Sequence, residues 1–281
     1  MAGTLYLCAT PIGNLDDMTF RVLDTLRSVD LIAAEDTRNS IKLLNRFEIK
    51  TPMTSYHEYN KVEKAEKLIA MMKEGKNIAL VTDAGTPAIS DPGEVLVAMC
   101  HENNIPVTSL PGACACITAL TLSGLPTRRF CFEAFLPTEK NDRRAILEDL
   151  KEESRTIILY EAPHHLKATL AELEDALGDR RITLCRELTK KFETVMPMTL
   201  SEAVAFYKEN EPKGEYVLVV EGKSLKARKE EKQKEWQQLS IEEHMALYEG
   251  REMDRKEAMK QVAKDRGISK REVYDYLIKN C

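Results

Sequence analysis

Three ionisable side chains lie within four positions at the end of a short apolar run. Glu35, Asp36 and Arg38 follow Asp30–Ala34, which is apolar enough to form a buried strand that ends at this point. Charged groups at the carboxyl end of a strand are well placed to face a substrate, where a carboxylate can take up a proton and a guanidinium can hold an anion. The alternative is a solvated surface cluster, and we favour the substrate-facing interpretation.

A second candidate is the stretch Asn77–Gly93. Its run Ile78–Val81 predicts a strand buried on both faces, and the glycines, prolines and short polar residues after it predict a structured loop before a helix. The loop contains no lysine or arginine and neither of the glycine motifs that bind nucleotide phosphates. It therefore favours a compact polar or zwitterionic ligand held by backbone groups and a carboxylate. A connection without a binding role is the alternative.

These candidate sites require an α/β scaffold, and the chain alternates accordingly. The first half is expected to form strands at Thr4–Ala9, Asp30–Ala34, Pro52–Ser55, Ile78–Val81 and Pro106–Leu110, with helices at Phe20–Ser28, Asn39–Phe47, Val62–Glu74, Glu94–His101 and Ala113–Leu122. About five β–α alternations argue for a mostly parallel sheet.

A second α/β lobe is expected to follow. Its strands are predicted at Phe130–Phe135, Arg155–Tyr160, Arg181–Arg186 and Tyr216–Glu221, and its helices at Asp142–Glu152, His164–Leu177 and Leu200–Tyr207. Polar residues again end two of these strands, at Tyr160–His164 and at Arg186–Lys190. Two lobes with polar loops predict a ligand cleft between them.

The length and composition predict a soluble protein of more than one domain. The chain has 281 residues and a formal net charge of −5, yet residues 226–281 carry 14 lysines and arginines against 12 acids, which allows a nucleic-acid partner. No apolar run is long enough to span a membrane, and no secretion signal opens the sequence, so we expect a cytoplasmic protein.

The seven cysteines are dispersed and follow no zinc spacing, which favours reduced thiols and no metal. Cys114 and Cys116 form the one close pair. Buried small side chains at the start of a helix are the favoured interpretation of this pair over a metal or redox site.

The end of the chain is predicted to be a helical module. Ala263, Gly267, Ile268 and Val273 have the spacing of a helix-turn-helix, with a plain three-helix bundle as the alternative. Eight basic residues of this module could contact phosphates: Arg255, Lys256, Lys260, Lys264, Arg266, Lys270, Arg271 and Lys279. The predicted organisation is a lobe at 1–122, a second lobe at 123–224, a charged linker at 225–238 and the helix-turn-helix module at 239–281.

Several ordered motifs carry a resemblance to a known family. They are Ala9–Leu15 (A-T-P-I-G-N-L), Ala34–Arg38 (A-E-D-T-R), Thr82–Gly93 (T-D-A-G-T-P-A-I-S-D-P-G), Leu110–Gly112 (L-P-G), Ser123–Pro126 (S-G-L-P), Tyr160–His164 (Y-E-A-P-H), Arg186–Lys190 (R-E-L-T-K) and Lys213–Glu215 (K-G-E). Together they resemble the ribosomal RNA small subunit methyltransferase I group of the tetrapyrrole methylase superfamily over essentially the whole chain. Cys114, Cys116, Ala134, Ala162 and His165 depart from the group's usual residues, and Ala134 stands where glycine is usual.

The resemblance implies an S-adenosyl-L-methionine-dependent enzyme that methylates the ribose 2′-hydroxyl of a decoding-site cytidine in 16S rRNA, within the 30S ribosomal subunit or as free RNA. It also implies a homodimer with no membrane association and a cofactor cleft between the two lobes. The residues that it assigns to the cofactor are Pro11, Asp83, Ala84, Gly85, Ile89, Ser90, Ala115, Ser123, Tyr160, Leu188, Gly214 and Glu215.

Methyl transfer to a hydroxyl needs alignment of the two reacting groups and help in removing the proton. Asp36 or Glu35 is the candidate base, and Arg38 and Lys190 are candidates to hold phosphates or the developing alkoxide. Two other functions stay open at this point. One is methylation of a tetrapyrrole or another small acceptor, and the other is a non-catalytic regulator that binds nucleic acid through its carboxyl-terminal module.

Overall fold

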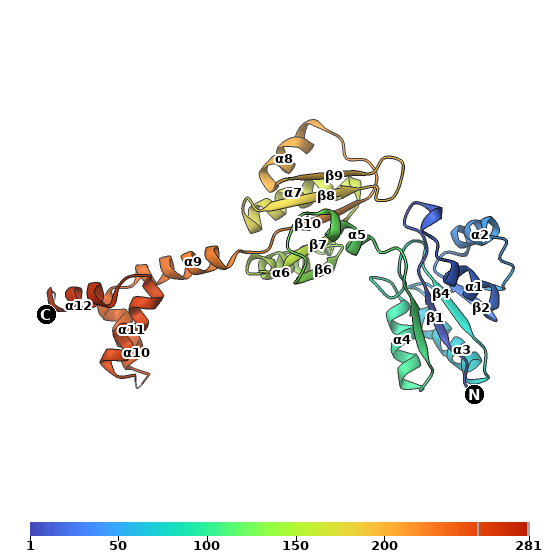
Figure 1. Ribbon diagram of the computed structural model, residues 1–281, viewed down its shortest axis with the longest axis horizontal. Coiled ribbons are helices and arrows are strands. Elements are labelled where there is room, and N and C mark those ends of the chain that lie inside the picture. Colours follow the sequence, from blue (N-terminus) through green and yellow to red (C-terminus); the bar gives the residue numbers. More distant parts are fainter. Residues whose placement is uncertain (252, 280–281) are drawn as a thin grey trace. The chain divides into compact units, whose positions relative to one another are not determined.

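The structure is a computed structural model that describes residues 1–251 and 253–279 (Figure 1). It forms two compact units, one of residues 1–147 and 156–221 and one of residues 148–155 and 222–281. Within the described ranges, no helix combines the length and the apolar character that crossing a bilayer requires.

The first sheet of the larger unit is parallel throughout, where the sequence predicts a mostly parallel sheet. Its strand order is β3-β2-β4-β1-β5, and the strands are β1 (Leu5–Cys8), β2 (Leu31–Ala34), β3 (Met53–Ser55), β4 (Ile78–Val81) and β5 (Val107–Leu110). Each crossover is a helix: α1 (Phe20–Ser28), α2 (Thr37–Arg46), α3 (Lys61–Lys73) and α4 (Gly93–Glu102). A short 3-10 helix, η1 (Leu15–Asp17), follows β1 and precedes α1.

The central strand β4 is buried on both faces, which explains its continuous apolar sequence. Ile78 and Leu80 pack in one core with α3 and α4, whereas Ala79 and Val81 pack in the other core with α1 and α2. Helices therefore cover both faces of the sheet, and its polar loops are left at the carboxyl edge, where open α/β sheets bind ligands.

The second sheet is mixed, with the order β6-β7-β10-β8-β9. Its strands are β6 (Phe130–Ala134), β7 (Thr156–Glu161), β8 (Arg181–Arg186), β9 (Thr194–Thr199) and β10 (Tyr216–Val220), of which β6 and β7 alone are parallel. The helices of this part are α5 (Ala115–Leu122), α6 (Lys140–Lys151), α7 (Pro163–Leu177) and α8 (Leu200–Glu209). Helix α5, which the predicted division at residue 122 assigns to the first lobe, packs on β7 and β10 of the second sheet.

The smaller unit contains the helices α9 (Leu225–Gln238), α10 (Ile241–Glu249), α11 (Arg255–Arg266) and α12 (Lys270–Lys279). Gly267 ends α11 in the left-handed conformation at φ 68°, and Ala263 and Val273 are buried on either side of this turn. The segment predicted as a charged linker is helical, because lysine, glutamate and glutamine are good helix formers even where no apolar face repeats. Cys281 lies outside the described residues.

Candidate functional site

The loop between β4 and α4 is fixed at both of its ends. Thr10, just after β1, exchanges backbone hydrogen bonds with Gly85, N to O at 2.9 Å and O to N at 3.1 Å. Gly85 has φ +87°, a backbone conformation that is unfavourable for residues with a Cβ atom, so glycine suits this turn. The Asp91 carboxylate accepts hydrogen bonds from the backbone N–H groups of Ala88, Ile89 and Gly93 at 3.0, 3.2 and 2.7 Å. The loop therefore has a defined conformation held by hydrogen bonds, as its composition predicts.

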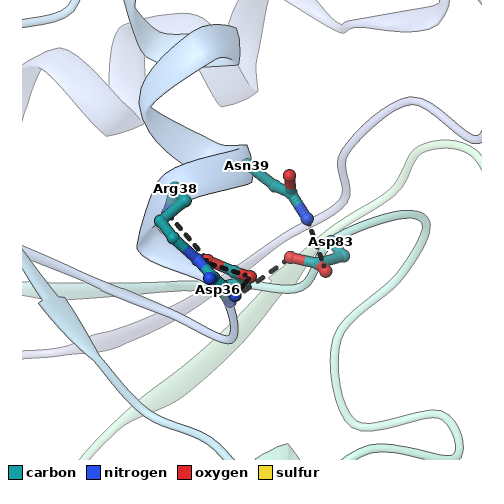
Figure 2. A network of polar contacts seen from close by, with 4 residues as sticks. All are labelled: Asp36, Arg38, Asn39 and Asp83. Carbon is teal, nitrogen blue, oxygen red and sulfur yellow. Dashed lines mark hydrogen bonds and ion pairs between the residues drawn. The ribbon is translucent and has the colours of Figure 1, made fainter.

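The carboxyl ends of β2 and β4 are joined through Asp83 (Figure 2). Its carboxylate accepts hydrogen bonds from the backbone N–H of Asp36 at 3.3 Å and from the Asn39 side-chain amide at 3.1 Å. Its own backbone N–H donates to a Glu35 carboxylate oxygen at 3.4 Å. The two sequence motifs that contain these residues therefore form one polar cluster.

Asp36 is the N-cap of helix α2 and the partner of Arg38. The Arg38 guanidinium donates to both Asp36 carboxylate oxygens, at 3.0 Å from Nε and 2.6 Å from a terminal nitrogen, and the Arg38 backbone N–H adds a further bond at 2.8 Å (Figure 2). These hydrogen bonds from Arg38 lower the pKa of Asp36 to about 2. A carboxylate so stabilised in its charged form is a weak proton acceptor.

Glu35 has the opposite environment. The residue is half-buried, and this desolvation, aided by the nearby carboxylates of Asp83, Asp91 and Asp36, raises its pKa above the ordinary value. A raised pKa makes a carboxylate a stronger base at neutral pH. Of the two carboxylates that the sequence nominates, the structure thus favours Glu35 for proton transfer.

In the second sheet, the loop after β8 presents Lys190. Its ammonium group donates to the carboxylates of Glu187 at 2.9 Å and Glu215 at 2.8 Å. Burial acts to lower the pKa of Lys190, but the two hydrogen bonds outweigh it and the pKa is raised, so this lysine stays charged. Glu187 and Thr189 both have positive φ, 52° and 63°, which marks the loop as locally strained.

A cavity of about 500 Å³ lies beside these groups in the larger unit. Of the predicted residues, those that line it are Glu35, Lys190, Asp83, Ala84, Gly85, Ile89, Ala115, Tyr160, Leu188 and Glu215. Those that do not line it are Asp36, Arg38, Pro11, Ser90, Ser123 and Gly214.

Some of the residues outside the lining still support it. The Ser123 hydroxyl donates to the Leu120 carbonyl and shapes the end of α5. Gly214, at φ +79°, leaves the space that the Glu187 side chain occupies, since a Cβ there would lie 2.5 Å from Glu187 Cγ. Pro11 lies between Thr10, which bridges to Gly85, and Ile12, which lines the cavity.

Sequence reasoning missed half of the lining. The additional residues are Ile12, Thr86, Cys114, Phe135, Glu161, Ala162, Pro163, Cys185, Tyr216 and Val217. Glu161, Ala162 and Pro163 belong to a polar strand end that the sequence did single out, so their position at this strand end is a signal by which they could have been identified. Cys114 belongs to the close cysteine pair, which the sequence also singled out. Among the described residues, no three His, Cys, Asp or Glu side chains are grouped as metal ligands would be.

Comparison with known proteins identifies the family and the fold. A sequence model of the family described as Tetrapyrrole (Corrin/Porphyrin) Methylases matches residues 4–204. Solved structures show the same fold. A diphthine synthase superposes with a TM-score of 0.60 at 16% identity, covering 79% of this chain and 91% of its own, and a uroporphyrin-III-C-methyltransferase from Thermus thermophilus superposes with 0.55 at 18%, covering 77% and 94%.

Curated relatives are much closer in sequence. A protein of Halalkalibacterium halodurans named Ribosomal RNA small subunit methyltransferase I is 50% identical over 273 residues, which are 97% of this chain and 94% of the relative. The Bacillus subtilis protein of the same name is also 50% identical over 273 residues, with 97% and 93% covered. The fold, the cavity at the strand ends and this similarity lead to one conclusion: the chain belongs to the ribosomal RNA small subunit methyltransferase I family of the tetrapyrrole methylases and is a methyltransferase.

Proposed function

We propose that this protein transfers a methyl group from S-adenosyl-L-methionine to the ribose 2′-hydroxyl of a cytidine in 16S rRNA. The observation that carries the proposal is the cavity in which Glu35 and Asp83, at the ends of two parallel strands, share one lining with Tyr160 and Lys190. The family membership supports the same reaction class.

The lining fits S-adenosyl-L-methionine in size and in chemistry. A volume of about 500 Å³ lies within the range of small-ligand pockets, roughly 300–1,000 Å³. Ile12, Ile89, Leu188 and Val217 offer apolar surface to an adenine, and carboxylates are available for hydroxyl, amino and sulfonium groups. The bound cofactor would supply a methyl group on a positively charged sulfur.

Glu35 is the residue that we propose as the base. Its raised pKa and its place in the cavity lining suit it to accept the proton of the ribose hydroxyl, whereas Asp36 lies outside the lining and is held by Arg38. We therefore assign Asp36 a positioning role, since its side chain caps α2 and orients Arg38.

The two basic candidates differ in how they could meet RNA. Arg38 has a side chain that is 88% exposed, so its guanidinium can reach a phosphate while it holds Asp36. Lys190 lies in the cavity lining between two carboxylates, so its charge is already balanced. We propose that Arg38 contacts the RNA backbone and that Lys190 fixes Glu215 in the cavity wall.

The helical module supplies further contacts to rRNA in this proposal. Six basic side chains of α11 and α12 are exposed, namely Arg255, Lys256, Lys260, Lys264, Lys270 and Arg271. Arg266, which the sequence placed in the same set, is buried and donates to the carbonyl of Ser240 and to His244, so it is structural. Exposed cations of this kind provide affinity for the phosphate backbone without reading sequence.

We also propose that the protein acts as a homodimer. Six of the eight residues of helix α5 are apolar, and although one face packs on the second sheet, Ile117 and Leu122 stay 44% and 43% exposed. A helix of this composition is normally covered on every face. A second copy of the chain is the proposed cover, and Leu122→Lys should then convert a dimer to a monomer in sedimentation equilibrium.

A labelling experiment tests the reaction. The protein is incubated with cofactor carrying a labelled methyl group and, in separate tubes, 30S subunits, naked 16S rRNA or a porphyrinoid. Label should enter 16S rRNA in one of the first two tubes and should remain in an alkali-resistant dinucleotide that contains cytidine, because a 2′-O-methyl group blocks alkaline cleavage. Labelling of the porphyrinoid, or alkali-labile product, would contradict the proposal.

A further inference from the structure

Two thiols touch each other in the wall of the cavity. Cys114 Sγ and Cys116 Sγ are 3.4 Å apart at the start of helix α5, where Cys114 is the N-cap. Cys116 is buried, as the sequence predicts, but Cys114 is only half-buried and lines the cavity. The pair is therefore open to a small molecule through one of its two sulfurs.

The surroundings shift the pKa values of the two thiols in opposite directions. The contact with the Cys116 thiol, together with the backbone N–H groups of Ile117 and Cys116 and the Thr86 side chain, stabilises charge on Cys114, so the pKa of Cys114 is lowered. The same contact and burial raise the pKa of Cys116. A thiolate at a helix N-terminus is the reactive form of cysteine toward oxidants and alkylating agents.

We propose that Cys114 and Cys116 are an oxidisable dithiol that responds to hydrogen peroxide and closes as a disulfide in the cavity wall. The Cys114 thiolate attacks the peroxide O–O bond, which gives a sulfenic acid on Cys114 and releases the other oxygen as water after protonation. The Cys116 sulfur then attacks the sulfenic sulfur, the S–S bond forms and a second water leaves. Two electrons pass from the two sulfurs to the peroxide, which is the oxidant that the step requires.

Formation of this disulfide would alter the parts of the cavity wall that α5 and β7 contribute. The backbone N–H of Cys116 donates to the Tyr160 hydroxyl at 3.2 Å, so movement in the first turn of α5 reaches the strand β7. Tyr160, Ala115 and Cys114 all line the cavity. We expect the oxidised protein to bind S-adenosylhomocysteine more weakly. This consequence rests on the proposed cofactor site, whereas the dithiol chemistry is independent of that site.

The thiol chemistry is tested first, without cofactor. The reduced protein is alkylated with iodoacetamide from pH 5 to pH 10, and each cysteine is followed by peptide mass spectrometry. Cys114 should reach half of its maximal rate below about pH 7.5, the upper end of the range for activated thiols. Cys185 is the control, since it lines the same cavity while burial raises its pKa to about 12. A Cys114 midpoint at or above pH 7.5 would overturn the proposal.

Peroxide then tests the pairing. One equivalent of hydrogen peroxide should leave two fewer titratable thiols than the seven of the reduced chain, with Cys114 and Cys116 in one linked peptide. Cys116→Ala should instead accumulate a sulfenic acid on Cys114 that dimedone traps, and Cys114→Ser should abolish both products. Oxidation at other cysteines first, or no difference between these variants, would refute the dithiol.

The link to the cofactor cavity has its own measurement. Calorimetry establishes whether S-adenosylhomocysteine binds the reduced protein, and bound ligand should slow alkylation of Cys114 at least tenfold. Binding without protection would show that Cys114 does not share the ligand's site and would overturn this part of the inference. If no binding occurs, the proposed cofactor site fails, while the alkylation and peroxide results still decide the dithiol.

Discussion

Asp83 and Glu35 end two neighbouring parallel strands and are joined by a hydrogen bond of 3.4 Å from the Asp83 backbone N–H to a Glu35 carboxylate oxygen. This bond favours the charged form of Glu35, but burial outweighs it and the pKa of Glu35 is raised. The pair therefore keeps a comparatively basic carboxylate at a fixed position in the cavity lining.

Substitution of Glu35 and of Asp36, each in its own variant, tests which of the two carboxylates is the base. Glu35→Gln should lower kcat by roughly 10²-fold or more, the contribution typical of general-base catalysis. Asp36→Asn keeps a residue that caps helices well and should lower kcat much less. The acid limb of the pH–rate profile should follow Glu35, with activity lost as pH falls through its raised pKa because the base becomes protonated. Equal losses in the two variants would contradict the assignment.

Substitution of two glycines with positive φ distinguishes the effect of backbone strain from the effect of disturbing the site. Gly214→Ala and Gly178→Ala should each cost on the order of 1–3 kcal/mol of stability, because both backbones are unfavourable for alanine. Only at residue 214 would the new Cβ meet Glu187, the partner of Lys190, since a Cβ at residue 178 would have no described atom within 4 Å apart from its own residue and its chain neighbours.

Cofactor affinity should therefore fall at least about tenfold, or about 1.4 kcal/mol, in the first variant alone. Calorimetry at a temperature where both variants are folded measures this difference. Similar affinities in the two would remove Gly214 from the support of the site.

A stabilising substitution follows from the bulge in β6. Ala134 has φ +52° at the point where the register with β7 shifts. Ala134→Gly should raise the free energy of unfolding by roughly 0.5–1 kcal/mol, because relief of the left-handed strain exceeds the added chain entropy. Ala162→Gly is the matched control with an ordinary φ of −84° and should lower stability instead. Urea midpoints at constant slope measure both changes.

The helical module should lose stability in acid. His244 is fully buried, stacked on Trp236 at 4.0 Å, and accepts at Nδ1 from Arg266 at 3.1 Å. Burial and the Arg266 charge lower its pKa, although Asp265, with an oxygen 3.6 Å from Nε2, acts in the opposite direction, and Tyr248 packs beside the ring. The unfolded state then binds more protons, so stability is complete above the ordinary histidine pKa of about 6.5 and falls as pH decreases below it.

Trp236 is the one tryptophan of the chain, so its fluorescence reports on this module. Denaturant unfolding followed by this signal should give lower midpoints at pH 5 than at pH 7.5. His244→Gln removes the titrating group and should flatten the dependence. A slope that persists unchanged in this variant would assign it to other groups.

Charge removal on α11 tests the proposed binding of RNA. Lys256, Lys260 and Lys264 are exposed, and replacing them with glutamine should reduce the salt slope of rRNA binding by about 0.7–0.9 for each phosphate that the module no longer neutralises. Lys61→Gln with Lys67→Gln on α3 is the control for a general change in charge. An unchanged slope, with cofactor affinity also unchanged, would mean that the module serves another purpose.

Much of the scaffold could be predicted because its signals are local. Helix α1 begins at Phe20 and ends at Ser28, as its periodicity predicts, and the continuous apolar run of β4 correctly indicates a strand buried on both faces. Strand β9 (Thr194–Thr199) was missed, because Pro197 and two methionines interrupt any β-branched run and its pairing with β8 is set by tertiary context.

The site was predicted less completely, for a physical reason. Sequence places Glu35 and Asp36 side by side and cannot tell that one faces the cavity while the other turns back to Arg38, because that choice depends on side-chain direction at the start of α2. In the same way, the acidity of Cys114 depends on interactions with Cys116 and Thr86 that form only in the fold.

The strand order of the first sheet also has a consequence for synthesis of the chain. Leu5–Cys8 is made first, yet both of its neighbours, β4 and β5, come much later, and pairing is complete only with Leu110. At roughly 5–20 residues per second, translation leaves this strand without its partners for on the order of 5–20 s. Strand β1 therefore spends that interval as an apolar segment whose pairing is incomplete, open to chaperones, and the carboxyl edge that bears Glu35 and Asp83 takes shape only after the whole first sheet has emerged from the ribosome.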